Sequence, residues 1–167
     1  MRAVAVIAAA ALAVAGFWAV GVATPPAPVA LQGDTLGPLQ GESAHEYARR
    51  AEGTLDHENA SFALVTFVDP LGAADAAAVL RPAPRVSALV VRGQAPIVVP
   101  EPAIGKTRID VLRSATTNPL TGAVVHCRRE DLLRMSADDR VLAVEMLPAD
   151  AVWGAFALTP STTAGRV

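Results

Sequence analysis

The N-terminal segment constrains this chain more than any other feature. Ala3 to Ala23 is an unbroken run of 21 apolar or small residues, and the next charged residue is Asp34. A helix of about 20 such residues spans a hydrocarbon core of about 30 Å. We therefore expect residues 3–23 to lie in the membrane. Together with the first two residues they would form a transmembrane anchor, residues 1–23. Because Arg2 precedes the run, the positive-inside rule places the N-terminus in the cytoplasm and the rest of the chain outside.

A cleaved signal peptide is the alternative for the same segment, because Gly21-Val22-Ala23 is a small-x-small sequence. The apolar core of a signal peptide usually has about 7 to 15 residues. The longer run here favours an uncleaved anchor, and hence a single-pass protein of the cell membrane. Both interpretations export the domain that follows, so the location of that domain does not depend on cleavage after Ala23.

Three further regions follow the apolar run. Residues 24–41 are rich in proline and glycine and almost uncharged, which predicts an extended spacer. Residues 42–158 have the size of one domain, and residues 159–167 are expected to form a flexible tail. The chain is 52% apolar but only 4% aromatic, so the core of this extracytoplasmic domain must consist of small side chains.

The first half of the domain shows one helix and then a strand, a helix and a strand. Ser43 and Glu46 have the spacing of a capping box, and the helix from 44 to 57 would bury Tyr47, Ala51 and Leu55. The remaining predictions are a strand at 62–68 that Asp69-Pro70 ends, a helix at 72–80, a strand at 85–92, and an irregular insertion at 93–121 with a short strand at Arg108 to Leu112.

The second half repeats this pattern with a strand at 122–128, a helix at 130–135 and a strand at 140–147. Two βαβ units in tandem predict an α+β fold of the ferredoxin-like kind, βαββαβ, a four-stranded antiparallel sheet with two helices on one face. The expected strand order is fourth, first, third, second. Since strand 62–68 is apolar on both sides, the second face needs a cover from the insertion, the C-terminal tail or a partner. The alternation in residues 152–158 suggests a tail that extends the sheet edge.

The sequence GAVVHCRREDLLRMSADDRVLAVE, residues 122–145, resembles the second half of subtilase propeptides and related peptidase inhibitors. In that family a strand, a helix with paired leucines, an acidic turn and a Val-x-x-Val-Glu strand follow one another. The resemblance implies the fold, and it suggests a regulator of an exported peptidase. Asp138-Asp139 stands where the family has Asp-Pro, and no protease domain follows, so a role in cis is not expected. The whole chain also resembles small single-pass envelope proteins of high-GC Gram-positive bacteria.

The polar residues suggest no catalytic residue, no cofactor-binding residue and no metal ligand. Cys127 is the single cysteine, and its neighbour His126 should point to the opposite face of a strand. His45 lacks the second histidine of a zinc-binding helix, and the acidic pairs Glu130-Asp131 and Asp138-Asp139 fit a helix N-terminus and a turn.

The charge pattern excludes one class of partner. A net charge of −2 without a basic stripe does not fit nucleic-acid binding. The leading hypothesis is a non-enzymatic, membrane-anchored extracytoplasmic interaction module, which binds an envelope protein through a sheet face or an edge strand. The alternative is an inhibitor or chaperone-like regulator of an exported peptidase.

Overall fold

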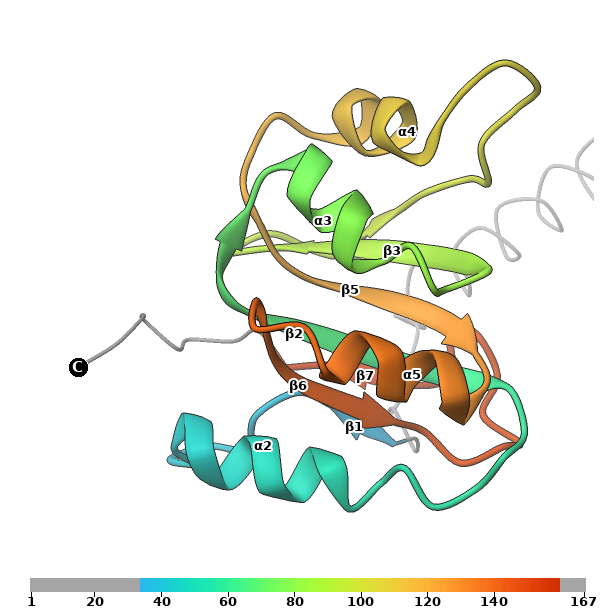
Figure 1. The fold of residues 1–167 in the computed structure, drawn as a ribbon. Coiled ribbons are helices and arrows are strands. Elements are labelled where there is room, and N and C mark those ends of the chain that lie inside the picture. The colour runs from blue at the N-terminus through green and yellow to red at the C-terminus, as the bar shows by residue number, and fades with distance from the viewer. Residues whose placement is uncertain (1–33, 160–167) are drawn as a thin grey trace, which may run out of the picture. The chain divides into compact units, whose positions relative to one another are not determined.

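A five-stranded antiparallel sheet lies at the centre of the computed structural model, which describes residues 34–159 (Figure 1). Its strands are β2 (Ser61–Leu71), β3 (Arg85–Val91), β4 (Ile97–Val98), β5 (Leu120–Cys127) and β6 (Val141–Met146). They stand in the order β4-β3-β5-β2-β6. The four longer strands thus have the predicted order, and β4 adds a fifth strand that the sequence analysis did not place.

The predicted anchor, the first part of the predicted spacer and nearly all of the predicted tail lie outside the described residues. Among residues 34–159, no helix combines the length and the apolar character that crossing a bilayer requires.

β2 is apolar on both sides over its first half, as the sequence predicted for residues 62–68. In β2, Ala63 and Val65 face the main core, while Phe62 and Leu64 face the opposite side of the sheet. Contrary to the expectation, the strand does not end at Asp69-Pro70. It continues to Leu71, which pairs with Leu120 beyond a register shift. The proline lies in this irregular stretch, where its missing N–H breaks no regular ladder.

The main core lies between the sheet and the helices α3 (Ala73–Val79), α4 (Arg108–Ala115) and α5 (Arg129–Ser136), which Figure 1 shows on one side of the sheet. α3 connects β2 to β3, and α5 connects β5 to β6. In each case the two strands are parallel to each other and one antiparallel strand lies between them. α4 packs beside α3. The larger buried side chains of these helices are Leu112, Leu132 and Met135, together with Leu80 at the end of α3.

α4 replaces the short strand predicted at Arg108 to Leu112, and this prediction was wrong. Thr107 caps the helix, since its side chain accepts from the Asp110 N–H while the Asp110 carboxylate accepts from the Thr107 N–H. The alternation of the segment is compatible with a helix because Leu112 alone is fully buried and Ile109 and Val111 are only partly covered. The capping box was the signal that the sequence analysis overlooked.

The second face of the sheet is covered by a two-stranded parallel sheet, β1 (Thr35–Leu36) and β7 (Ala157–Leu158), and by the residues before β7. Leu36 is completely buried against Leu64 and Val124 of the main sheet. The C-terminal segment therefore covers a face, as one expectation had it, and does not extend the sheet edge. β1 also shows that the fold begins within the predicted spacer of residues 24–41.

α2 (Ala44–Glu52) packs alongside β6, with Tyr47 and Ala51 against Ala143. The predicted capping box is present, because the Ser43 hydroxyl accepts from the Glu46 N–H and the Glu46 carboxylate accepts from the Ser43 N–H. The helix ends before Gly53 and not at residue 57. This earlier end puts Leu55 in the following turn, where it is still buried in the main core.

Candidate interaction surface

The outer edge of β4 offers an open backbone position. In the described structure β4 pairs with β3 alone, with Val98 opposite Ala88 and Ile97 opposite Leu89. The Val99 N–H donates to the Ser87 carbonyl at 3.2 Å, so Val99 turns its peptide groups toward β3. Peptide groups alternate in direction along a strand. The N–H and the C=O of Val98 consequently point away from the sheet.

Two prolines limit this open edge to one residue. Pro96 lies two positions before Val98 and Pro100 two positions after it, so their backbone groups also point away from β3. Proline, however, has no N–H to donate. Proline on an edge strand is a common protection against uncontrolled strand addition. The edge keeps one N–H donor, that of Val98, whose side chain is 66% exposed.

An apolar groove of about 480 Å³ lies between β4 and α4. Its floor and walls come from three places: the strand, the turn after it and the exposed side of α4. The residues are Ile97, Val98, Val99, Pro100, Glu101, Ala103, Lys106, Asp110, Val111, Ser114 and Ala115. Most of these side chains are apolar or small. Glu101 and Lys106 are charged and exposed, and the partly buried Asp110 has its carboxylate bound by Thr107. Such a composition fits an apolar side chain of a partner better than a polar metabolite.

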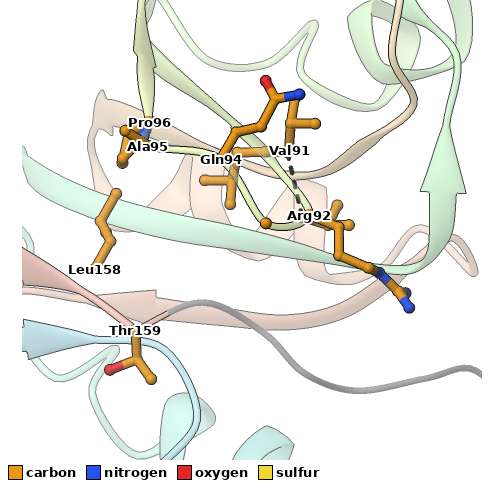
Figure 2. A pocket seen from close by; sticks show the side chains of 10 residues that line it. Val91, Arg92, Gln94, Ala95, Pro96, Leu158 and Thr159 are labelled. Carbon is orange, nitrogen blue, oxygen red and sulfur yellow. Dashed lines mark hydrogen bonds between the residues drawn. The ribbon is translucent and has the colours of Figure 1, made fainter.

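A second hollow, of about 410 Å³, lies between the β3–β4 turn and the end of β7. Figure 2 shows Gln94, Ala95 and Pro96 on one side of it and Leu158 and Thr159 on the other. The Gln94 N–H is used within the turn, donating to the Val91 carbonyl at 3.2 Å. The lining has a single charged side chain, that of Arg92, so no acid/base pair converges here.

A buried ionic cluster joins α2 to β6 and to the turn after β1. The Arg50 guanidinium contacts the Glu145 carboxylate, donates to Glu42 at 2.8 Å and 3.0 Å, and donates to the Gly37 carbonyl at 2.9 Å. The Gly37 N–H donates to Oε2 of Glu145 at 2.6 Å. The Glu145 side chain is only 5% exposed, and both of its oxygens have partners. The cluster is therefore suited to hold the N-terminal strand on the sheet.

The same cluster changes the ionisation of its members. Hydrogen bonds from Arg50 lower the pKa of the partly buried Glu42 carboxyl, and those from Glu42 raise the pKa of Arg50. Burial raises the pKa of the Tyr47 hydroxyl, which lies 3.1 Å from the Thr66 hydroxyl. All these shifts favour the protonation states that the groups have at neutral pH, so none provides a proton-transfer group there.

The structure separates His126 and Cys127 as the sequence predicted. Cys127 lies in the main core, where burial raises the pKa of its thiol to about 12. His126 lies on the other face and packs edge-on against Phe62, with ring centroids 4.7 Å apart. Phe62 also contacts Trp153 and Phe156, at 5.4 Å and 5.6 Å. This aromatic group fixes the segment before β7 to the sheet.

The acidic candidates serve local structure. Asp131 accepts from Arg134 at 2.8 Å within α5, and Glu130 lies 3.7 Å from the same guanidinium. Asp138 binds Arg140 at the turn before β6, and these hydrogen bonds lower the Asp138 pKa to about 2.

The residues around His45 are likewise accounted for. His45 and Arg49 are exposed on α2, Glu46 belongs to the capping box, and Glu42 binds Arg50.

Within residues 34–159, no three His, Cys, Asp or Glu side chains are grouped so that they could hold a metal ion. In comparisons of the chain with known proteins, no protein-family model, no curated protein and no solved structure matches.

Proposed function

We propose that the chain is a membrane-anchored, extracytoplasmic interaction module without enzymatic activity, built on a ferredoxin-like arrangement of two βαβ units. Its docking surface is the outer edge of β4 together with the groove between β4 and α4. The observation that carries the proposal is the Val98 backbone, which points its N–H and C=O away from the sheet beside an apolar groove of about 480 Å³. Strand addition with side chains in adjacent pockets is a common mode of protein recognition.

The polar groups of the described residues support a binding role over catalysis. Glu145 and Arg50 are committed to holding β1 on the sheet, and Cys127 stays a neutral thiol at physiological pH. The groove between β4 and α4 and the hollow beside the β3–β4 turn hold no nucleophile paired with a base. A surface that relies on backbone pairing and apolar contact needs neither.

The membrane part of the proposal depends on residues 3–23. Their uncharged run is long enough for a bilayer, and Arg2 before it orients the rest of the chain outward. A cysteine-labelling experiment tests this orientation. Val152 is 66% exposed, and we expect a Val152→Cys thiol in intact cells to react with a membrane-impermeant maleimide. Labelling only after cell lysis would contradict the proposed topology.

Photo-crosslinking of the full chain in cells tests the docking surface. A photoreactive residue at Val98 should give a discrete adduct with a protein, whereas the same residue at Leu133 on α5 should not. Leu133 is a matched control because it is an exposed apolar side chain, 41% accessible, outside the groove. Equal adduct yields at the two positions would remove the proposed surface.

Regulation of an exported peptidase is a second candidate. It is favoured by the order of β5, α5 and β6, which follows the propeptide-like sequence of residues 122–145. We expect such a regulator to change the rate of an exported peptidase through the same edge, so wild-type chain and Val98→Pro should differ when added to secreted peptidase. Identical peptidase rates with both chains would exclude this candidate.

A further inference from the structure

We propose that the partner at the β4–α4 surface is a second copy of the same chain, bound about a two-fold axis at Val98. This inference rests on the proposed function and names the occupant of its docking surface. A two-fold contact requires one surface to be complementary to itself, so that each feature meets its counterpart on the other copy. The surface meets this requirement in its backbone, in its apolar side chains and in its charges.

The backbone of β4 is arranged symmetrically about Val98. The sequence from Pro96 to Pro100 is Pro-Ile-Val-Val-Pro, with a β-branched residue on each side of Val98 and a proline beyond it. In an antiparallel pair centred on Val98, the two valines would exchange both N–H···O bonds. The prolines would end the pairing after this residue in both directions, so the contact stays short and does not propagate into a fibre.

The apolar part of the surface consists of the projecting side chain of Ile104 and the apolar groove between β4 and α4. Ile104 is fully exposed, with a relative accessibility of 107%. It lies in a turn closed by the hydrogen bond from the Lys106 N–H to the Ala103 carbonyl, at 2.9 Å. Gly105, the next residue, has a φ of +80°. This ordered turn presents Ile104 at the rim of the groove, since Ala103 and Lys106 both line it.

Ile104 does not fill the groove of its own chain, because it retains its full exposure. A two-fold operation about Val98 carries the turn of one copy toward the groove of the other, and each Ile104 then covers Val111 and Ala115 of its partner copy. Because of the two-fold symmetry, this contact between Ile104 and the groove forms twice in the dimer. Burial of one isoleucine is worth about 1.5 to 3 kcal/mol, so each Ile104 contributes on the order of tenfold or more to the association constant.

The rim carries charges of both signs. Asp110 also lines the groove, but its carboxylate accepts from the N–H and the hydroxyl of Thr107 at the start of α4. Glu101 and Lys106 are exposed and flank the same turn, and neither forms an ion pair within residues 34–159. A self-complementary surface needs both signs, because each copy must supply the countercharge of the other. Confinement of two anchored chains to one membrane would raise their effective concentration, so a small contact suffices.

Disulfide trapping in membranes containing the full chain tests this inference. Residues opposite each other in a hydrogen-bonded antiparallel pair have Cα atoms about 5.5 Å apart, within the range of a disulfide. Val98→Cys should therefore form a covalent dimer on mild oxidation, at least about tenfold faster than Leu133→Cys. The wild-type chain controls for Cys127, which is buried.

A second substitution shows whether the trapped dimer uses the groove. Ile104→Asp, combined with Val98→Cys, should slow trapping to the rate of Leu133→Cys, because a carboxylate cannot enter the apolar groove. Ile104 has no buried contacts, so its replacement leaves the fold intact. The inference would be overturned if Val98→Cys formed the covalent dimer no faster than the Leu133→Cys control. It would also be overturned if Ile104→Asp left the rate of dimer formation unchanged.

The outcome also separates this inference from the proposed function. If photo-crosslinking at Val98 yields an adduct with a different protein while Val98→Cys gives no covalent dimer, the docking surface stands and the second copy is excluded. If neither experiment gives a product above the Leu133 control, both proposals fall.

Discussion

Replacing Arg50 with alanine should destabilise the fold more than any surface charge substitution in the chain. Arg50 contacts the Glu145 carboxylate, which is 5% exposed, and binds Glu42 and the Gly37 carbonyl as well. After Arg50→Ala, the Glu145 carboxylate retains the Gly37 N–H, which donates at 2.6 Å, but no cation. The variant therefore leaves a buried charge without its countercharge and removes the side chain that joins α2 to the turn after β1.

The magnitude follows from the burial of the two partners. Breaking a fully buried ion pair costs about 3 to 5 kcal/mol. The Arg50 side chain is 31% exposed, so water can reach part of the vacated space, and we expect a loss of about 2 to 4 kcal/mol. Arg134→Ala is the matched control, because Arg134 is 62% exposed and exposed pairs contribute about 0 to 1 kcal/mol.

Urea unfolding of the full chain, followed by circular dichroism, measures both free energies of unfolding. Arg50→Ala combined with Glu145→Gln should recover at least about 1 kcal/mol of the loss, because the neutral amide removes the unpaired charge. Equal stabilities of Arg50→Ala and Arg134→Ala, or no recovery in the double variant, would refute the assignment of a buried ionic cluster.

Three further predictions concern packing, capping and ionisation. Gly122→Ala should cost on the order of 2 kcal/mol, because a Cβ there would lie 2.6 Å from the Val65 carbonyl oxygen, whereas Gly72→Ala, with open space around it, should be nearly neutral in the same unfolding assay. Thr107→Ala should destabilise α4 by about 1 kcal/mol, measured by urea unfolding, and Thr107→Ser should not; equal losses would contradict the cap. The Cys127 pKa is raised from 9.0 to about 12, so the neutral thiol is favoured in the folded state and stability should fall as pH rises above about 9; alkylation at pH 9 should be fast only in urea, and fast labelling of the folded chain would contradict its burial.

The arrangement of the four longer strands could be predicted because each is a mostly apolar run and the two βαβ units have helices of ordinary length. A right-handed crossover after 62–68 and another after 122–128 leave few alternatives for the strand order. The fifth strand could also have been found. Pro96 and Pro100 bracket three β-branched residues, and such proline spacing is typical of an edge strand.

The rest of the structure depends on pairings that sequence patterns do not reveal. Arg50 and Glu145 are separated by 95 positions, and Gly37 and Glu145 by 108, so no local spacing connects them. β1 and β7 have two residues each, too few for a periodic pattern. The sequence resemblance places Glu145 only in a propeptide-like strand, although an acidic residue amid apolar ones in a strand suggests a buried partner.

Val98→Pro tests the docking edge most directly, because it removes a single N–H that the sheet itself does not use. If this N–H points away from β3, the full-length variant should unfold with a free energy within about 0.5 kcal/mol of wild type, because proline is tolerated on an open edge. Its association in membranes, measured by crosslinking efficiency, should fall at least about tenfold. Unchanged association, or a loss of stability showing that β3 needs this N–H, would contradict the proposed surface.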